Sequence, residues 1–212
     1  MTQFKHSFRI VGIGASMTAG TPGFFSPRER PPAGEGDERS QYAYWMRELR
    51  PGWEILNRGM RGQRTDQILQ RFDFDVLDNR PDCMILMAGT NDLYQGFGLQ
   101  KPLQNLKAMF QKACQAGIAS VSASIPPLNV APQPLKELIL EFNEKLQSLA
   151  GGMGIVFCDI YRVMEDPERP GFIPHSPDNV HPDVEGYRRA GEAFVPAVEE
   201  ALRKAGKLKP VI

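Results

Sequence analysis

The chain has 212 residues, of which 42% are hydrophobic, and its 25 basic side chains balance 25 acidic ones. This length and apolar content suit one domain, spanning residues 1–212, with a sizeable buried core. A formal net charge of zero provides no overall field to attract nucleic acid or an anionic membrane surface. No apolar run reaches the length of a membrane span. We therefore expect neither a nucleic-acid partner nor a membrane span, and the oligomeric state stays open.

The cysteines and the N-terminal segment bear on the compartment. Cys83, Cys114 and Cys158 are odd in number and far apart, which favours reduced core residues over a disulfide framework or a metal site. Basic residues precede an apolar run near the N-terminus and resemble the start of a signal peptide. Cleavage there would remove the first predicted strand, so we expect a mature, cytoplasmic protein.

Predicted strands alternate with predicted helices along the chain. The apolar segments expected to form strands are residues 8–13, 53–56, 83–87, 119–124 and 155–159. Apolar residues with the helical period predict helices over residues 42–49, 66–77, 103–113, 135–149 and 183–205. A repeated β-α order favours a parallel sheet with helices on both faces. The sequence therefore predicts an α/β fold.

The first predicted strand runs into the small residues Gly14-Ala15-Ser16-Met17-Thr18-Ala19-Gly20. This turn puts the Ser16 hydroxyl just past the carboxyl end of a strand, where ligands bind in open α/β sheets. A serine that caps a helix is the plainer alternative. Met17 stands where a dinucleotide fingerprint needs its third glycine, and the turn lacks the Gly-Lys-Ser/Thr of a phosphate loop. Neither nucleotide-binding motif is therefore favoured.

Residues 21–40 follow directly behind Ser16 and contain four prolines and three glycines. A loop of this length inside a compact domain is usually functional or disordered. Because it starts beside the serine, it is a candidate lid over a site there.

A second informative segment, Asp178-Asn179-Val180-His181-Pro182, stands just before the last predicted helix. An aspartate three residues before a histidine can turn its carboxylate onto the imidazole Nδ1, which leaves Nε2 free to take a proton from a hydroxyl. The alternatives are that Asp178 caps a turn and that His181 lies at the surface. His175 suggests a metal site, but no third His or Cys with suitable spacing accompanies it. We therefore predict no metal.

Two further segments end predicted strands: Asn57-Arg58-Gly59-Met60-Arg61-Gly62 and Gly89-Thr90-Asn91-Asp92. Acyl transfer builds negative charge on a carbonyl oxygen, so N–H donors must already be aimed at that oxygen. The backbone N–H of Gly59 and the side-chain amide of Asn91 can serve as such donors. A tight turn at Gly59 and a turn or helix cap at Asn91 are the alternatives.

Together the four segments resemble the sequence blocks of the SGNH hydrolases, also called the GDSL esterase/lipase family. They come in the family's order and span nearly the whole chain. The resemblance implies a three-layer α/β/α sandwich, flavodoxin-like, with a five-stranded parallel sheet. The chain departs from the family pattern at Ala15, where the family carries an aspartate. The nearest rival is the α/β-hydrolase fold, whose serine normally follows a mid-sheet strand in a G-x-S-x-G elbow.

Carried over position by position, the resemblance implies that Ser16 is the nucleophile, His181 the general base and Asp178 the residue that holds the imidazole. The backbone N–H groups of Ser16 and Gly59 and the Asn91 amide would form the oxyanion hole. No cofactor is implied. The expected reaction is hydrolysis of a carboxylic ester or thioester with a short-to-medium acyl or aryl group, through an acyl-enzyme on Ser16.

The expected partner is a small-molecule ester, and mostly apolar loop residues are expected to shape its pocket: Phe24, Phe25, Arg61, Tyr94, Phe97, Leu128 and Phe172. The alternative is that the apolar side chains fasten the loops to the core. The nearby basic residues favour a substrate with an anionic group, or else they pair with acidic neighbours. These basic residues are Arg58, Arg61 and Arg64, and the acidic neighbours are Asp66, Asp73 and Asp75.

Other functions stay open at this point. The family includes carbohydrate O-deacetylases and lysophospholipases, and the sequence does not separate them. From another class, an inactive binding protein could keep the fold and lose the chemistry, with Ala15 as its support. A nucleotide-binding flavodoxin-like protein would need a phosphate loop that the first turn does not supply.

Overall fold

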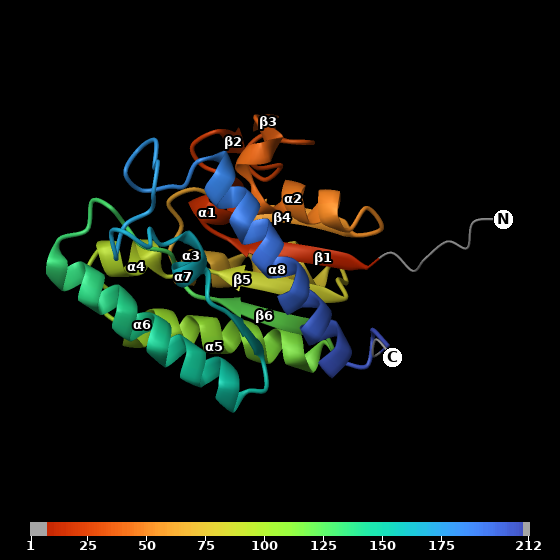
Figure 1. Ribbon diagram of the computed structural model, residues 1–212. Helices are drawn as coiled ribbons and strands as arrows, with labels where there is room; N and C mark the ends of the chain where they lie inside the picture. The colour runs from red at the N-terminus through yellow and green to blue at the C-terminus, as the bar shows by residue number, and fades with distance from the viewer. Residues whose placement is uncertain (1–7, 210–212) are drawn as a thin grey trace.

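The computed structural model describes residues 8–209, which form a central parallel sheet of five strands. The sheet order is β4-β1-β5-β6-β7, and every neighbouring pair is parallel (Figure 1). Counted along the chain, this is the 2-1-3-4-5 order of flavodoxin-like folds. The prediction of the fold class is confirmed. The strands are β1 (Arg9–Gly14), β4 (Glu54–Gly59), β5 (Cys83–Met87), β6 (Ala119–Ala123) and β7 (Val156–Cys158).

Helices cover both faces of the sheet and complete three layers. One face carries α2 (Tyr42–Leu49), α7 (Ile160–Met164) and α8 (Val184–Lys204). The other face carries α3 (Thr65–Gln70), α5 (Gln100–Gln115) and α6 (Gln133–Gly152). In Figure 1, α8 crosses in front of the sheet, and α5 and α6 run along its lower side. Within residues 8–209, every helix is too short or too polar to cross a membrane.

Two apolar clusters fill the spaces between the layers. Successive residues of β1 point into different clusters. Ile10 belongs to the cluster between the sheet and α2 and α8, and Val11 belongs to the cluster between the sheet and α3, α5 and α6. This is the pattern of a strand buried on both faces. In the first cluster the rings of Tyr42 and Phe194 lie 4.7 Å apart between centroids. In the second, Phe110 is fully buried.

The predicted elements agree with the structure except at some boundaries. The helix over residues 42–49 and the strand over residues 83–87 have the predicted bounds. The second strand is longer than predicted, because β4 stays paired with β1 as far as Gly59. The predicted helix over residues 66–77 is two elements, α3 and a π-helix, η2 (Asp73–Leu77), with Arg71 at the end of α3.

Several short elements in the loops were not predicted. α1 (Ser16–Ala19) follows β1, and α4 (Thr90–Tyr94) follows β5. Residues 21–40 hold a small hairpin and a 3₁₀ turn: β2 (Phe24–Phe25), β3 (Glu35–Gly36) and η1 (Glu38–Ser40). Segments this short contain too few turns or alternations for hydrophobic periodicity to reveal them.

Gly89, which precedes α4, joins the core tightly to a loop of the predicted site. Its φ is +131°, and a Cβ there would lie 2.6 Å from Cζ of Phe142 on α6. We expect Gly89→Ala to lower the free energy of unfolding by about 2–4 kcal/mol, since backbone strain and a steric clash add together. Urea unfolding of the purified variant measures this loss.

Gly96 offers a matched control for this substitution. Its φ is +78°, but nothing lies within 4 Å of the position of its Cβ. Gly96→Ala therefore carries the backbone strain without the clash, and it should cost less than Gly89→Ala. Equal losses in the two variants would contradict the proposed contact with Phe142.

Candidate active site

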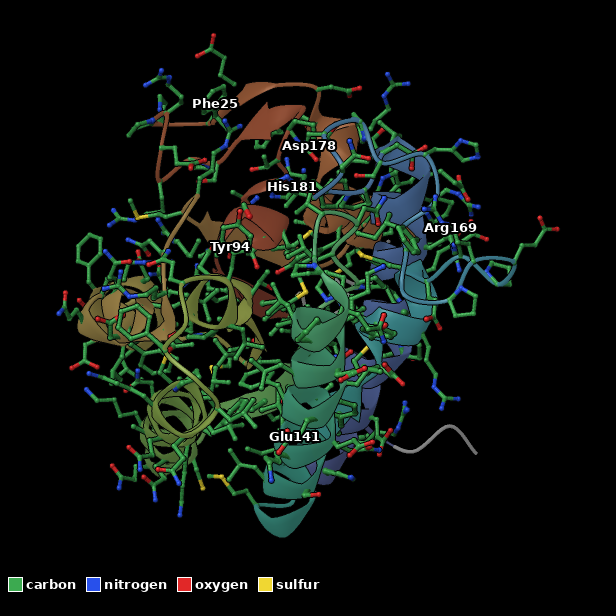
Figure 2. All side chains as sticks on the ribbon, turned by 90° about the vertical axis from the view of Figure 1, so that its left-hand side faces the viewer. Phe25, Tyr94, Glu141, Arg169, Asp178 and His181 are labelled. Carbon is green, nitrogen blue, oxygen red and sulfur yellow. The ribbon has the colours of Figure 1, made fainter. Side chains whose placement is uncertain are left out.

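The predicted catalytic residues meet at the carboxyl edge of the sheet. Ser16 is the first residue of α1, directly after β1, and His181 lies in the loop before α8. Figure 2 looks onto this edge, where Asp178 and His181 lie between Phe25 and Tyr94 in the view. β1 has β4 on one side and β5 on the other, so the strand order reverses here. Such a reversal is where ligands bind in open α/β sheets.

Ser16, His181 and Asp178 form a series of hydrogen bonds. His181 Nε2 lies 2.8 Å from Ser16 Oγ, and His181 Nδ1 lies 2.7 Å from Asp178 Oδ2. The other carboxylate oxygen accepts the backbone N–H groups of Val180 at 2.9 Å and His181 at 2.7 Å. The carboxylate is thus held by the backbone of its own loop, and both ring nitrogens of the buried His181 are engaged.

The protonation of this series follows from the environment of Asp178. Burial alone would raise the pKa of Asp178, but hydrogen bonds from the His181 ring and from two backbone N–H groups outweigh it. The pKa therefore lies below its ordinary value. An ionised carboxylate only accepts hydrogen bonds, so Nδ1 of His181 carries a hydrogen, and in the neutral ring Nε2 is left to accept from the Ser16 hydroxyl. The arrangement can take a proton from the Ser16 hydroxyl.

Ser16, Gly62 and Asn91 come from three loops, line one pocket and carry N–H donors. The Asn91 side-chain amide donates to the backbone carbonyl of Gln63 at 2.8 Å, which joins the loop after β5 to the turn after β4. An amide nitrogen carries two hydrogens, so one remains. Gly62 lies in the turn after β4 with φ +71°, and its N–H has no acceptor among the described residues. The Ser16 N–H stands at the start of α1, where helix N–H groups lack an internal partner.

Gly59 does not occupy the position predicted from the sequence. Its N–H donates to Oδ1 of Asn57 at 2.9 Å, and its neighbour in the sheet is Gly14. A Cβ at Gly59 would lie 2.1 Å from the backbone N of Ala19, so close packing of β4 against α1 requires this glycine. The prediction that Gly59 donates to an oxyanion is therefore corrected. The glycine of this segment that lines the site is Gly62.

A cavity of about 290 Å³ opens beside Ser16. This volume is at the small end of the range for ligand sites. Its polar side chains are those of Ser16, Thr21, Arg61, Thr90, Asn91 and His181. Its apolar wall comprises Ala15, Met17, Met87, Ala88, Ile125, Pro126 and Val180. Most residues of the wall stand at the end of a strand or shortly after it. Met87 ends β5, and Ile125 comes shortly after β6. Attention to every strand end would have found these residues from the sequence.

Of the predicted substrate-binding residues, only Arg61 lines this cavity. Phe24 and Leu128 are buried, at 2% and 3% exposure, and Leu128 belongs to the core cluster over α5 and α6. Tyr94 and Phe97 are instead 62% and 45% exposed. Phe24 and Leu128 therefore fasten their loops to the core, which is the alternative that the sequence left open.

Phe25 and Phe172 also lie outside the cavity wall, and cationic side chains stack on their rings. The Arg61 guanidinium carbon lies 3.6 Å from the Phe25 ring centroid. Phe172 has Lys136 Nζ at 3.2 Å and the Arg169 guanidinium carbon at 3.5 Å from its centroid. Sequence patterns do not reveal the stacking of Arg61 on Phe25 or of Lys136 on Phe172, since these partners are distant in the chain.

Arg61 reaches the cavity but is engaged by the hairpin segment 21–40. Its guanidinium donates to the Phe24 carbonyl at 2.8 Å, and its backbone N–H donates to Glu29 at 2.8 Å. Its Nε lies 3.8 Å from the Glu29 carboxylate. The segment is fixed at two further points, because Ser26 Oγ donates to the Gly59 carbonyl and Tyr187 Oη donates to the Thr21 carbonyl. Arg61 therefore anchors this segment beside the site.

The two neighbouring arginines are also paired. Arg64 lies 3.1 Å from the Asp66 carboxylate, as one alternative from the sequence predicts, and Arg58 donates to the Asn79 side chain at 3.0 Å. Neither side chain lines the cavity. Of the three arginines considered for an anionic substrate, Arg61 is the one beside the cavity.

Comparison with known proteins identifies the family. A family model described as "GDSL-like Lipase/Acylhydrolase family" matches residues 13–189. The chain belongs to this family. It is therefore an acylhydrolase of the GDSL type, and the resemblance seen in the sequence is confirmed.

Relatives of this GDSL enzyme include solved structures. One, described as a lipolytic protein of the G-D-S-L family from Desulfitobacterium hafniense DCB-2, superposes with a TM-score of 0.75 at 26% identity, covering 90% of this chain and 99% of that one. A catalytic mutant of Axe2, an acetylxylan esterase from Geobacillus stearothermophilus, superposes with a TM-score of 0.70 at 17% identity, covering 99% and 100%. An acetylxylan esterase sequence from the same organism is 21% identical over 160 residues, covering 68% and 71%.

We expect Arg61→Ala to leave the preference of this GDSL enzyme between neutral and anionic esters unchanged, because the Arg61 guanidinium is already engaged by the Glu29 carboxylate, the Phe24 carbonyl and the Phe25 ring. The substitution should instead destabilise the protein by about 1–3 kcal/mol, since it removes an anchor of segment 21–40. The measurements are kcat/KM for paired neutral and anionic esters and the melting temperature. Arg64→Ala, outside the cavity, is the control. A loss selective for anionic esters would assign Arg61 to substrate binding.

Proposed function

We propose that this GDSL enzyme hydrolyses carboxylic esters of short acyl groups through a covalent acyl-enzyme on Ser16. The observation that carries the proposal is the hydrogen-bonded series of Ser16, His181 and Asp178 at the wall of a small apolar cavity. As the Ser16 oxygen attacks the ester carbonyl, Nε2 of His181 takes its proton and passes it to the leaving alcohol. The same nitrogen then takes a proton from water, which releases the acid.

We assign the oxyanion hole to the N–H groups of Ser16 and Gly62 and to the remaining N–H of Asn91. All three residues line the cavity. Donors that are already in place stabilise the developing negative charge without reorganisation at the moment of reaction. The bond from Asn91 to the Gln63 carbonyl supports this assignment, because it restricts rotation of the amide.

The size and character of the cavity support a short acyl group. A volume of about 290 Å³ with a mainly apolar wall suits acetyl or a similar group better than the chain of a lysophospholipid. A carbohydrate acetyl ester is the second candidate. It is supported by the acetylxylan esterase relatives and by the exposed Tyr94, at the end of α4, whose ring is available to lie against a sugar.

Ser16→Ala tests the proposal. Turnover should fall on the order of 10⁴-fold or more, because the nucleophile is lost. The melting temperature should barely change, since a single hydroxyl is removed. Wild-type protein should be labelled at Ser16 by a fluorophosphonate probe, and a folded wild type that resists the probe would favour the inactive binding protein. A series of p-nitrophenyl esters from acetate to palmitate, with an acetylated xylo-oligosaccharide, would rank the substrate classes.

Asn91→Ala should lower kcat by about 10²–10³-fold with a smaller change in KM, because its amide is asked to bind charge that develops mainly in the transition state. Asn105→Ala is the control, since the Asn105 amide donates to Thr65 and lies outside the cavity. Steady-state kinetics on both variants separates the effects. A loss confined to KM would make Asn91 a residue that binds the ground state.

A further inference from the structure

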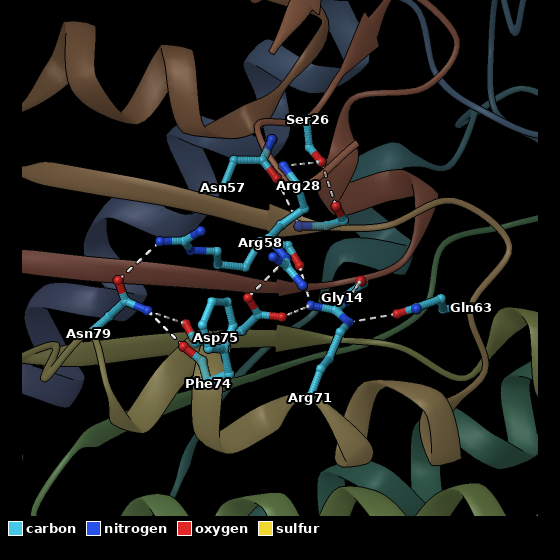
Figure 3. A network of polar contacts seen from close by, with 11 residues as sticks. Gly14, Ser26, Arg28, Asn57, Arg58, Gln63, Arg71, Phe74, Asp75 and Asn79 are labelled. Atoms are coloured by element: carbon cyan, nitrogen blue, oxygen red, sulfur yellow. Dashed lines mark hydrogen bonds and ion pairs between the residues drawn. The ribbon is translucent and has the colours of Figure 1, made fainter. Parts of the chain in front are cut away.

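Arg71 lies among the loops that carry the site without lining the cavity itself. Its side chain is 10% exposed and sits at the end of α3. Its guanidinium donates to the Gly14 carbonyl at 2.8 Å, the Arg58 carbonyl at 2.8 Å and Gln63 Oε1 at 2.6 Å. It also donates to Asp75 Oδ2 at 2.6 Å (Figure 3). One side chain thus bonds to the ends of two strands and to the turn after β4.

The acceptors of Arg71 lie in, or contact, all three loops that supply the assigned oxyanion donors. Gly14 stands two residues before Ser16. Gln63 directly follows Gly62, and its backbone carbonyl accepts the Asn91 amide at 2.8 Å. Movement of the Arg71 guanidinium would therefore release the turn of Ser16 and the turn of Gly62 together. Through Gln63 it would also shift the acceptor of Asn91.

Asp75 holds the Arg71 guanidinium from the opposite side. Its side chain is fully buried, and its second oxygen lies 3.0 Å from Nε of Arg28. Asp75 stands in the π-helix η2, a wide turn of a type found often at functional sites. A buried ion pair is commonly no more stabilising than well-packed apolar side chains. A contribution to folding stability therefore does not by itself explain why Arg71 and Asp75 form a buried ion pair.

We propose that Arg71, held by Asp75, is a positioning residue for the hydrolysis. It keeps the N–H donors of Ser16, Gly62 and Asn91 in the positions needed to bind the oxyanion. This inference rests on the proposed function. Alanine at position 15 has no side-chain acceptor or donor, so the turn of Ser16 is tied through the Gly14 carbonyl instead. A displacement of about 1 Å in a catalytic group can cost about 10²-fold in rate.

Arg71→Lys is the first test. Lysine keeps the positive charge beside Asp75, but one ammonium group cannot reproduce the planar fork that reaches acceptors in several directions. We expect kcat for p-nitrophenyl acetate to fall about 10–100-fold with little change in KM. The rate of fluorophosphonate labelling of Ser16 should fall in parallel, which gives a readout independent of the natural substrate.

Arg50→Lys is the matched control. Arg50 likewise donates to a carboxylate, that of Glu199, and to a backbone carbonyl, that of Leu49, but it joins α2 to α8 and does not line the cavity. Its kcat should equal that of the wild type. Melting temperatures of the two lysine variants separate lost stability from lost rate.

A double-mutant cycle with Asn91→Ala distinguishes positioning from a purely structural role. If Arg71 acts through the oxyanion hole, Arg71→Lys should cost less kcat in the Asn91→Ala background, because the hole is already incomplete. A structural role would give the same fold-loss in both backgrounds. Should Arg71→Lys fail to fold, Gln63→Leu removes one acceptor and keeps the backbone carbonyl that Asn91 uses. It should lower kcat by about 3–10-fold.

The outcomes separate this proposal from the proposed function. A folded Arg71→Lys variant with wild-type kcat, a loss confined to KM, or equal fold-losses in the double-mutant cycle would overturn the role of Arg71 while wild-type Ser16 is still labelled. If Arg71→Lys does not fold, wild-type kcat in Gln63→Leu overturns it instead. A wild type that is inactive and unlabelled at Ser16, or an active Ser16→Ala variant, would overturn the proposed function and this proposal with it.

Discussion

The pairing of β1 with β4 on one side and β5 on the other is the constraint on which the site depends. All three strands are parallel, so their carboxyl ends meet at one edge of the sheet. Residues far apart in sequence are thereby brought together: Ser16 follows β1, Gly62 follows β4 and Asn91 follows β5. The buried apolar clusters on both faces hold the strands in this register. The helices that cover the two faces of the sheet carry none of the proposed catalytic side chains and serve to keep the edge rigid.

The loop before α8 then adds the proposed base, His181, to an edge that already carries the proposed nucleophile, Ser16. Two backbone N–H groups of this loop fix the Asp178 carboxylate. Because that carboxylate holds the His181 ring, the ring stays within hydrogen-bond distance of Ser16. The small apolar cavity beside this pair limits what can be presented to it. In the proposed function, the strand edge supplies the reacting groups, and the few side chains that directly follow the strands limit the size of the acyl group.

The sequence was most informative where function depends on residues close together in the chain. The three-residue spacing of Asp178 and His181 and the turn at Ser16 both predicted a relay whose distances the structure supplies. Gly59 was misassigned because β4 runs three residues beyond its apolar segment, and sequence alone does not distinguish a glycine in a strand from one in the next turn. The contacts of Arg71 were beyond prediction, since its acceptors include a backbone carbonyl 57 residues away.

Rapid mixing with p-nitrophenyl acetate tests whether an acyl group passes through Ser16. Samples quenched with acid in the first turnovers would be digested, and the peptide that carries Ser16 weighed by mass spectrometry. We expect an acetylated Ser16 that appears with the first release of p-nitrophenol and decays as substrate is exhausted. Continued release of p-nitrophenol by the enzyme, with Ser16 unmodified at every time, would contradict it.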